Sequence, residues 1–568
     1  MAIIGIDLGT TNSLAAVWRE GKSVLIPNAA GEYLTPSVVS VDEDGTVLVG
    51  RAARDRLITH PERTAAGFKR HMGTDKTWNL GDRAFLPEEL SSFVLRSLRE
   101  DAETFLKEPV TEAVVSVPAY FAERQRAATK RAAALAGLRV ERLVNEPSAA
   151  AVAGRVSEGD TVCLVFDLGG GTLDVSLVER FENVVSITAV SGDNKLGGWD
   201  FDRIIAQSFC QDCGLEFEGL SRQQKETLVR QAETCKMALT TQEPVIMAVE
   251  DETLSASLPL TNEWLIRKSG PLFQRMTVPI QRVISDAGLL KEDLDGLVMV
   301  GGSSHMPAVR RYIARFLGME PARNSRPDTV VALGAGICAG MKARASGLRE
   351  LVMTDVCPFT LGVNVLNPSN PSRPLMSPII ERNSVLPTSR MGIYQTARDG
   401  QEQVEIQIFQ GENRYCADNT PLGKLTLAVP PAPRGCQSVR VRFTYDINGL
   451  LEAEVLNERE ESARLVIQNQ DMTEEEVRRR LAELEELKLH PREREASRAL
   501  SARGERLYAM TVGELRSRVG AALDWFDQEL ASQEPIRIAR AQRQTGRFFD
   551  QVEAYLGVLP DGPGEDEE

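Results

Sequence analysis

The stretch Ile6-Asp7-Leu8-Gly9-Thr10-Thr11 has a near-copy in the same chain, Phe166-Asp167-Leu168-Gly169-Gly170-Gly171, which continues into Thr172. Each copy follows an apolar run that is typical of a buried strand, at residues 2–6 and 162–166. Each then turns through glycines and threonines into a second apolar run, at residues 14–18 and 173–177. The repeat therefore predicts two related strand–turn–strand units.

The chemistry of both turns indicates a phosphate-bearing ligand. Glycine allows positive φ and lets backbone N–H groups approach a ligand, and clustered N–H groups and hydroxyls bind anions. Asp7 and Asp167 are poorly placed for phosphate alone, but they suit a site that also holds a divalent cation or an attacking water. We therefore expect two halves of the chain to close on one nucleotide.

Composition narrows the class of protein. The 568 residues suggest three or four domains, and 42% hydrophobic residues are enough for ordinary cores. A net charge of -15 argues against a nucleic-acid binder, which usually presents a basic face. The chain has four histidines and eight scattered cysteines, with one C-x-x-C pair at Cys210 and Cys213. These counts argue against a zinc or histidine metal centre, so we expect the cysteines to be reduced.

The chain opens on a strand pattern, without the basic start and apolar core of a signal peptide. No run approaches the ~20 apolar residues that are needed to cross a bilayer. We expect a soluble, cytoplasmic protein that binds neither membrane nor nucleic acid.

The chain divides into three regions of different pattern. Up to about residue 345, helices are predicted at 88–107 and 123–136, and strands at 114–118 and 297–300. Beyond Gly347, period-two alternation predicts an antiparallel β domain with strands at 404–408, 425–427 and 439–443. A proline cluster predicts a loop before these strands, at Pro368, Pro371, Pro374 and Pro378.

The last region has a helical pattern. Thr473 and Glu476 form a capping box after Asp471, and helical spacing continues to about Leu556. The acidic end at 561–568 has no apolar anchor and is expected to be disordered.

Several further motifs join the two glycine turns in a recognisable set. They lie at residues 144–151, 196–202, 300–303, 355–362, 409–412 and 417–419. Together they resemble the motifs of the seventy-kilodalton heat-shock chaperones, the DnaK family, over residues 1–470, with a weaker match beyond. The compact length and short loops are most similar to the divergent bacterial HscC branch.

The resemblance implies a multidomain fold. It places an actin-like α/β ATPase domain of two lobes at 1–348, an interdomain linker at 349–355, an antiparallel β-sandwich peptide-binding domain at 356–470 and a short α-helical lid at 471–558. A disordered acidic tail would occupy 559–568.

The same resemblance assigns the chemistry of ATP hydrolysis. Lys69 would position the attacking water near the γ-phosphate, with Glu146 and Asp174 completing a polar cage, although a solvated loop lysine is the alternative for Lys69. Asp7 and Asp167 would hold Mg2+ through its water shell. Catalysis would be mostly positioning and charge stabilisation.

The residues expected to hold ATP or ADP lie on both halves. Thr10 and Thr11 would contact the β- and γ-phosphates, and Thr172 would do so from the other lobe. The remaining expected nucleotide contacts are Gly9, Asn12, Gly169, Gly170, Gly171, Gly197, Gly198, Glu233, Lys236, Thr240, Gly301, Gly302, Ser303 and Asp328. Met237 stands where relatives often carry an arginine that stacks on the base, and Trp199 replaces an acidic residue.

Coupling residues are also implied by the resemblance. The linker residues Leu351, Val352 and Met353, with Asp355, would dock on the ATPase domain in one nucleotide state, and the polar Thr354 should weaken docking modestly. Arg142 and Asp355 would form a pair for interdomain coupling and contact with a J-domain protein, and Pro118 and Arg126 would relay the nucleotide state to the linker. Ordinary packing is the alternative for these residues.

A peptide groove is expected in the β domain, to bind extended hydrophobic segments of unfolded proteins. Its matching residues are Val363, Leu366, Tyr394, Ala397, Val404, Ile406 and Ile408. The alternative is that this apolar row serves the β core.

The implied function is an ATP-dependent chaperone, with hydrolysis switching the groove between open and closed states. A J-domain co-chaperone is an expected partner, whereas the short segment between Thr240 and Arg275 predicts weak dependence on a GrpE-type exchange factor. Two other functions stay open: a nucleotide-binding co-chaperone or exchange factor with little turnover, and a small-molecule kinase of the actin-like fold. The β domain and linker argue against the kinase.

Overall fold

The computed structural model describes residues 2–153, 161–181, 184–250, 255–322, 327–345, 347–348, 351–446, 449–467, 495–533 and 535–556. The chain forms two compact units, of which the first comprises Met1–Phe359 and the second begins at Thr360. The predicted linker at 349–355 therefore falls within the first unit.

The two glycine turns connect strands of two similar sheets in the first unit. One sheet has the order β11 (Leu143–Asn145), β10 (Glu112–Val117), β1 (Ile3–Asp7), β2 (Asn12–Arg19), β3 (Lys22–Ile26). The other has the order β17 (Gly296–Val300), β12 (Thr161–Leu168), β13 (Leu173–Phe181), β14 (Val184–Asp193), β18 (Val352–Val356).

The neighbours of the repeated strands are equivalent in the two sheets. β1 runs parallel to β10 and antiparallel to β2, while β12 runs parallel to β17 and antiparallel to β13. The prediction of two related strand–turn–strand units is therefore confirmed, and both turns lie at the ends of equivalent strands.

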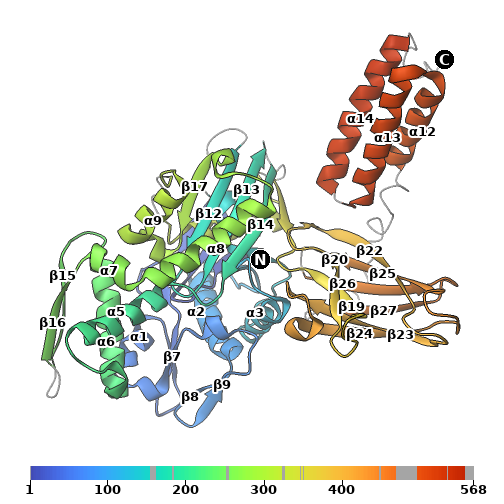
Figure 1. The fold of residues 1–568 in the computed structure, drawn as a ribbon. Helices are drawn as coiled ribbons and strands as arrows, with labels where there is room; N and C mark the ends of the chain where they lie inside the picture. Colours follow the sequence, from blue (N-terminus) through green and yellow to red (C-terminus); the bar gives the residue numbers. More distant parts are fainter. Residues whose placement is uncertain are drawn as a thin grey trace. The chain divides into compact units, whose positions relative to one another are not determined.

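Each sheet has its own hydrophobic core. One core joins β1 and β10 to α2 (Pro87–Leu106) and α3 (Glu123–Leu135). The other joins β12 and β13 to α5 (Gly198–Asp212), α6 (Arg222–Ala238), α7 (Asn262–Lys268), α8 (Gly270–Asp286) and α9 (Pro307–Leu317). Figure 1 shows α8 lying across β13 and β14. The predicted helices at 88–107 and 123–136 and strands at 114–118 and 297–300 are confirmed, because their apolar faces supply these cores.

Two helices pack beside the first sheet and close its remaining face. α10 (Val330–Lys342) contacts β1, β2 and α4 (Glu146–Ala153). Gly334 allows this close approach, since a Cβ there would lie 1.9 Å from the backbone oxygen of Ala149.

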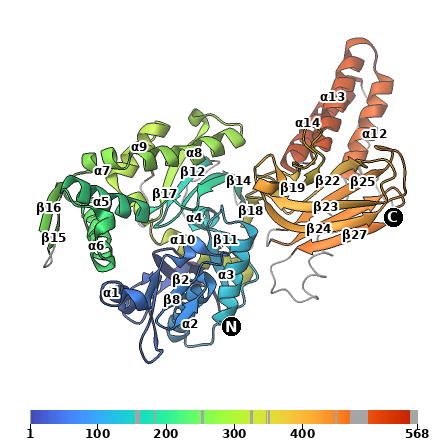
Figure 2. The ribbon, with the colours of Figure 1, turned by 60° about the horizontal axis from the view of Figure 1, so that its bottom comes forward.

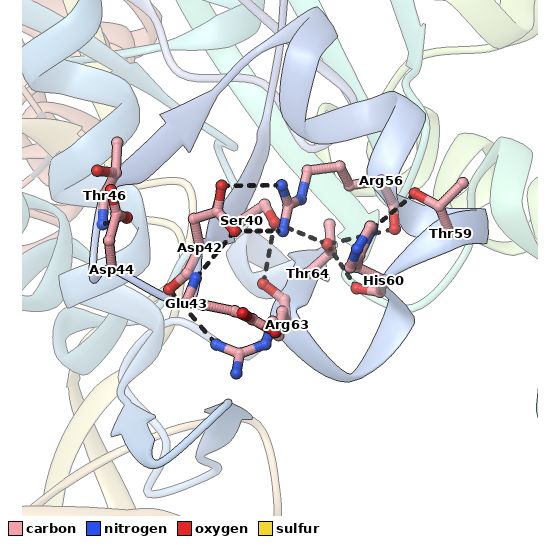
Figure 3. A network of polar contacts seen from close by, with 10 residues as sticks. All are labelled: Ser40, Asp42, Glu43, Asp44, Thr46, Arg56, Thr59, His60, Arg63 and Thr64. Atoms are coloured by element: carbon pink, nitrogen blue, oxygen red, sulfur yellow. Dashed lines mark hydrogen bonds and ion pairs between the residues drawn. The ribbon is translucent and has the colours of Figure 1, made fainter.

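A small sheet carries the segment that leads to Lys69. It consists of β6 (Val47–Val49), β5 (Val38–Val41) and β7 (Thr64–Ala66), with α1 (Arg51–Thr59) against it. Figure 3 shows the polar contacts that fasten β7: the Thr64 hydroxyl donates to Ser40 Oγ at 3.0 Å, and the Ser40 hydroxyl donates to the Arg63 carbonyl at 3.1 Å. The Arg56 guanidinium also donates to both carboxylate oxygens of Asp42, at 3.3 and 3.2 Å.

Short elements complete the first unit. These are β4 (Thr35–Pro36), β8 (Trp78–Leu80), β9 (Arg83–Phe85), the hairpin β15 (Val245–Glu250) with β16 (Ser255–Leu260), and the 3-10 turns η1 (Pro61–Arg63), η2 (Phe68–His71), η3 (Phe217–Gly219), η4 (Lys291–Asp293) and η5 (Gly302–His305). In Figures 1 and 2 the β15–β16 hairpin lies beside α6.

Two antiparallel sheets form the first part of the second unit. One has the order β20 (Leu375–Ile380), β19 (Leu361–Val365), β23 (Gln403–Gln410), β24 (Thr420–Ala428), and the other β22 (Thr388–Gln395), β25 (Ser438–Tyr445), β26 (Leu451–Asn457), β27 (Ser462–Ile467). Short elements here are β21 (Val385–Leu386) and η6 (Cys416–Asp418). The three strands predicted from alternation are confirmed as parts of β23, β24 and β25.

The predicted proline loop is correct only in part. Residues 366–374 connect β19 to β20, but Pro378 lies inside β20, opposite Gly362. β20 is an edge strand, where a residue without an N–H is tolerated.

Helices follow the sheets, as the pattern predicts. They are α12 (Glu495–Met510), α13 (Gly513–Ala531) and α14 (Pro535–Leu556), and both views show them side by side. The predicted capping box at Thr473 and Glu476 and the acidic end at 561–568 lie outside the described residues. Within the described ranges, no helix has the length and apolarity that crossing a membrane requires, and all eight cysteines are free thiols.

Candidate functional site

The two glycine turns face each other across a cavity of the first unit. A Cβ built on Gly170 would lie 1.9 Å from Thr11 Oγ1, and one built on Gly171 would lie 2.7 Å from Thr10 Cγ2. Only glycine allows the second turn to approach the threonines of the first turn this closely. The turns therefore meet as two halves of one binding surface.

The cavity between them has a volume of about 370 Å³. Most residues that the sequence assigned to ATP line it: Asp7, Gly9, Thr10, Thr11, Asn12, Lys69, Glu146, Asp167, Gly169, Gly170, Thr172, Glu233, Lys236, Thr240, Gly301, Gly302, Ser303 and Asp328. Four predicted residues, Gly171, Gly197, Gly198 and Asp174, are not in the lining.

These four residues support the lining from behind. A Cβ on Gly197 would lie 2.5 Å from the Gly171 amide nitrogen, and a Cβ on Gly198 would lie 2.3 Å from Ser303 Oγ. Asp174 pairs with Asp167 in the β12–β13 ladder. Gly301 is also required, because it has a φ of +83° and its Cβ would lie 2.5 Å from the Leu168 carbonyl.

A buried ion pair stands at one end of the cavity. Lys69 Nζ donates to Glu146 Oε1 at 2.7 Å, and the two side chains are 4% and 10% exposed. Lys69 lies in η2, and Glu146 begins α4 directly after β11. The solvated-loop alternative for Lys69 is therefore wrong.

Further carboxylates crowd around this pair. Loss of water raises the pKa of Asp7 to about 7, with Glu146 adding repulsion, although the Ser116 hydroxyl donates to Asp7 at 2.8 Å. Loss of water, then Glu146, also raises the pKa of Asp174 to about 7. The pKa of Asp167 is raised well above its usual value by the same loss of water and by the neighbouring carboxylates Glu146, Asp174 and Asp7.

This excess of negative charge suits a site that receives a cation. Within the described residues, no group of three or more His, Cys, Asp and Glu side chains is arranged to bind a metal ion directly. One buried oxygen of the lining, Thr11 Oγ1, has no hydrogen-bond partner among the described residues. Unpaired buried polar atoms are rare. Together with the neighbouring carboxylates, this hydroxyl fits a ligand that brings phosphate oxygens and a hydrated cation.

The opposite end of the cavity is held by ion pairs that the sequence did not reveal. Lys236 Nζ lies 2.7 Å from Asp202 Oδ1, and Glu233 accepts from the Arg54 guanidinium at 3.0 Å. The Thr240 hydroxyl donates to the Met237 carbonyl at 2.6 Å. Met237 is 60% exposed and lines the cavity, so an apolar surface remains there for a flat ring.

A comparison with protein families shows the family of the chain. The family model described as Hsp70 protein matches residues 3–82 and 76–534. The chain belongs to the Hsp70 family. Hsp70 proteins are nucleotide-binding ATPases, and membership of the Hsp70 family supports a chaperone role.

Residues 352–355 of the predicted linker lie in β18, which pairs in parallel with β14 through Val184↔Val352, Val185↔Met353 and Ser186↔Thr354. The hydroxyls of Ser186 and Thr354 lie 2.6 Å apart. Thr354 therefore has a polar partner, which offsets the weakening that we expected from its polarity.

Asp355 connects this strand to the interior of the ATPase unit. It accepts from Asn145 Nδ2 at 2.6 Å and from the Ser148 hydroxyl at 3.3 Å. Arg126 in turn donates to Asn145 Oδ1 at 2.7 Å and to the Phe121 carbonyl, next to the buried Pro118 turn, at 3.0 Å.

The predicted relay residues Arg126 and Asp355 are thus joined through Asn145, which the sequence did not single out. Arg142 forms no ion pair with Asp355 in the part of the chain that the structure describes. Leu351 and Met353 are half-buried, and the Cys338 thiol donates to the Met353 sulfur at 3.7 Å.

The residues expected in the Hsp70 peptide groove divide between core and surface. Val363, Ile406 and Ile408 are buried, and Val363 pairs with Ile408 across β19 and β23. Val404, Ile406 and Ile408 share one face of β23 because strand side chains alternate.

The remaining groove residues are more accessible. Leu366 is 39% exposed, and Val404, Tyr394 and Ala397 are half-buried. The Tyr394 hydroxyl lies 3.2 Å from Ser377 Oγ of the other sheet. The apolar row therefore serves the β core at one end and reaches the surface at Leu366.

Proposed function

We propose that this chain is an ATP-dependent molecular chaperone that binds extended hydrophobic segments of unfolded proteins. The observation that carries the proposal is the meeting of both glycine turns with the buried Lys69–Glu146 pair in one cavity. In the proposed assignment the first unit has the actin-like fold and the second is a β-sandwich with a helical lid.

The chain's own residues would act on ATP by positioning. The backbone and hydroxyls of Thr10, Thr11 and Thr172 would hold the phosphates, since these residues line the phosphate end of the cavity. Lys69, fixed by Glu146, would orient water towards the terminal phosphate. Asp7 and Asp167 would hold Mg2+ through water, and the ion would neutralise phosphate charge.

Coupling would run from the cavity to the linker strand. Glu146 is the neighbour of Asn145, and Asn145 donates to Asp355 at the end of β18. The nucleotide state would bias the docking of β18, and peptide affinity would differ between the two states. We further propose a J-domain partner, weak dependence on a GrpE-type exchange factor, a cytoplasmic location and kinship with the HscC branch.

Dissociation of a fluorescent peptide, measured with ATP and with ADP, tests the coupling. We expect dissociation to be faster with ATP by tenfold or more, in order of magnitude. Identical rates in both nucleotides would refute the coupling.

Single-turnover ATP hydrolysis separates this function from the alternatives. A Lys69→Ala variant should lose hydrolysis by roughly 10²–10³-fold, the scale expected for one electrostatic contact. Equal and negligible rates in both proteins would favour a nucleotide-binding exchange factor. Phosphate transfer to a small molecule, with no peptide binding, would favour a kinase.

A further inference from the structure

Trp199 lies at the first turn of α5, directly after the glycines that support the phosphate end of the cavity. The Gly198 amide donates to the Gly169 carbonyl at 3.0 Å, and the Trp199 amide donates to the Gly170 carbonyl at 2.9 Å. The backbone of Trp199 is therefore held in register with the second glycine turn.

The indole ring reaches across the cleft to Gly67. A Cβ built on Gly67 would lie 2.1 Å from Trp199 Cζ3 and 2.4 Å from Cη2. Gly67 has a φ of +67° and precedes η2, which carries Lys69. The ring thus occupies the space that any other residue at position 67 would fill.

A second cavity, of about 560 Å³, lies on the other side of this contact. Thr10, Thr11, Trp199 and Glu233 line both cavities, so Trp199 is part of the wall between them. Beside the ring, the Arg70 guanidinium lies 3.2 Å from the Asp200 carboxylate, which bridges the same two segments. A charged pair leaves its surroundings accessible to water, whereas a large apolar ring excludes it.

We propose that Trp199 is a positioning residue that closes the phosphate end of the nucleotide cavity by packing against Gly67, and thereby sets how fast phosphate and nucleotide leave. The proposal rests on the proposed ATPase function. Removal of the ring would widen the connection between the two cavities beside Thr10 and Thr11. In the proposed mechanism hydrolysis itself depends on Lys69 and Glu146.

The test uses the full-length chain and measures release separately from cleavage. In Trp199→Ala, release of inorganic phosphate after one turnover and dissociation of a fluorescent ADP should each be about tenfold faster, since losses of contact act mainly on dissociation rates. Single-turnover cleavage is measured in the same variant, and release should accelerate more than the cleavage rate changes. Trp199→Phe keeps a ring against Gly67 and should restore slow release.

Gly67→Ala supplies the matched variant, because its methyl group displaces the ring without removing it. It should speed release in the wild-type background and have no further effect on release in Trp199→Ala. Trp78→Phe is the control, since Trp78 lines the second cavity but not the first.

Unchanged release in Trp199→Ala, or equal effects of Gly67→Ala in both backgrounds, would overturn the proposal. If the wild type neither binds nor hydrolyses ATP, the proposed function fails instead. In that case the contact between Trp199 and Gly67 is tested by protein stability instead. The contact predicts that Trp199→Ala and Gly67→Ala together shift the unfolding midpoint by an amount that differs from the sum of their separate shifts.

Discussion

The Lys69 ammonium is the cation among four carboxylates, those of Asp7, Glu146, Asp167 and Asp174. Its shortest contact is to Glu146, at 2.7 Å, and it also lies 5.8 Å from the centroid of the Phe121 ring. Lys69 and Glu146 are both buried, so neither charge is compensated by water. The pair therefore contributes to folding as well as to the proposed chemistry.

Lys69→Met should destabilise the first unit by roughly 3–5 kcal/mol, because it leaves Glu146 buried without its partner. Urea unfolding of the purified variant measures the loss. The double variant Lys69→Met with Glu146→Gln removes the stranded charge and should recover much of the stability. A single variant as stable as wild type would contradict the buried ion pair.

The crowded carboxylates also predict a pH dependence. The pKa values of Asp7 and Asp174 rise from 3.8 to about 7 in the fold. A carboxyl with a raised pKa stabilises the folded state below its unfolded pKa, and this contribution is lost as pH rises through the folded value. The unfolding midpoint of the nucleotide-free protein should therefore fall between about pH 4 and pH 7.

Thermal unfolding across this pH range checks the prediction. Asp174→Asn should flatten the fall, and a Mg2+ ion held beside Asp7 and Asp167 should reduce it because the cation offsets the repulsion between carboxylates. A profile that rises with pH in the nucleotide-free protein would show that the carboxylates are not repelling one another as described.

At the scale of elements, β18 is joined to β14 by a short run of residue pairs. Three residue pairs join it to β14, and the Ser186–Thr354 hydroxyl contact and the Asp355–Asn145 hydrogen bond fasten its end. A pairing with β14 as short as this suits a strand that attaches and detaches during a cycle.

Thr354→Ala should loosen β18 by about 1 kcal/mol, the typical net worth of one hydrogen bond. Hydrogen exchange of the amides at 352–356 measures this loosening. Ser186→Ala alone should act similarly, and the double variant should cost less than the sum. Unaltered exchange in both single variants would mean that the hydroxyl pair does not hold the strand.

Local patterns predicted much of the fold and the cavity. The glycine turns, α2, α3 and the alternating strands are encoded within short windows of sequence, where spacing and residue type suffice. Contacts between distant segments escaped prediction. Asn145 and Asp355 are 210 residues apart, and the contact of Trp199 with Gly67 depends on two turns meeting across a cleft. Nothing in the residues beside Trp199 or Gly67 indicates the other partner.

At the scale of the whole molecule, the chain consists of two compact units, each with its own buried residues. Units with separate cores commonly unfold in separate transitions. The nucleotide cavity lies entirely within the first unit.

Calorimetry of the full chain should therefore resolve two transitions. An ATP analogue with Mg2+ at 100 times its Kd should stabilise the first unit by about 2.7 kcal/mol. Residues 1–359 alone should show the same shift. A single transition that shifts as a whole when the ATP analogue binds would indicate that the two units unfold together.

The two glycine turns meet in a reciprocal manner. Thr10 and Thr11 align with Gly170 and Gly171 in the repeat, and Gly170 faces Thr11 while Gly171 faces Thr10. Position i contacts position j and j contacts i, which is the signature of a twofold-symmetric homodimer. The consequence concerns which substitutions the two turns tolerate: a side chain added at Gly170 or Gly171 would collide with the threonine opposite, so each turn limits the size of the residues in the other.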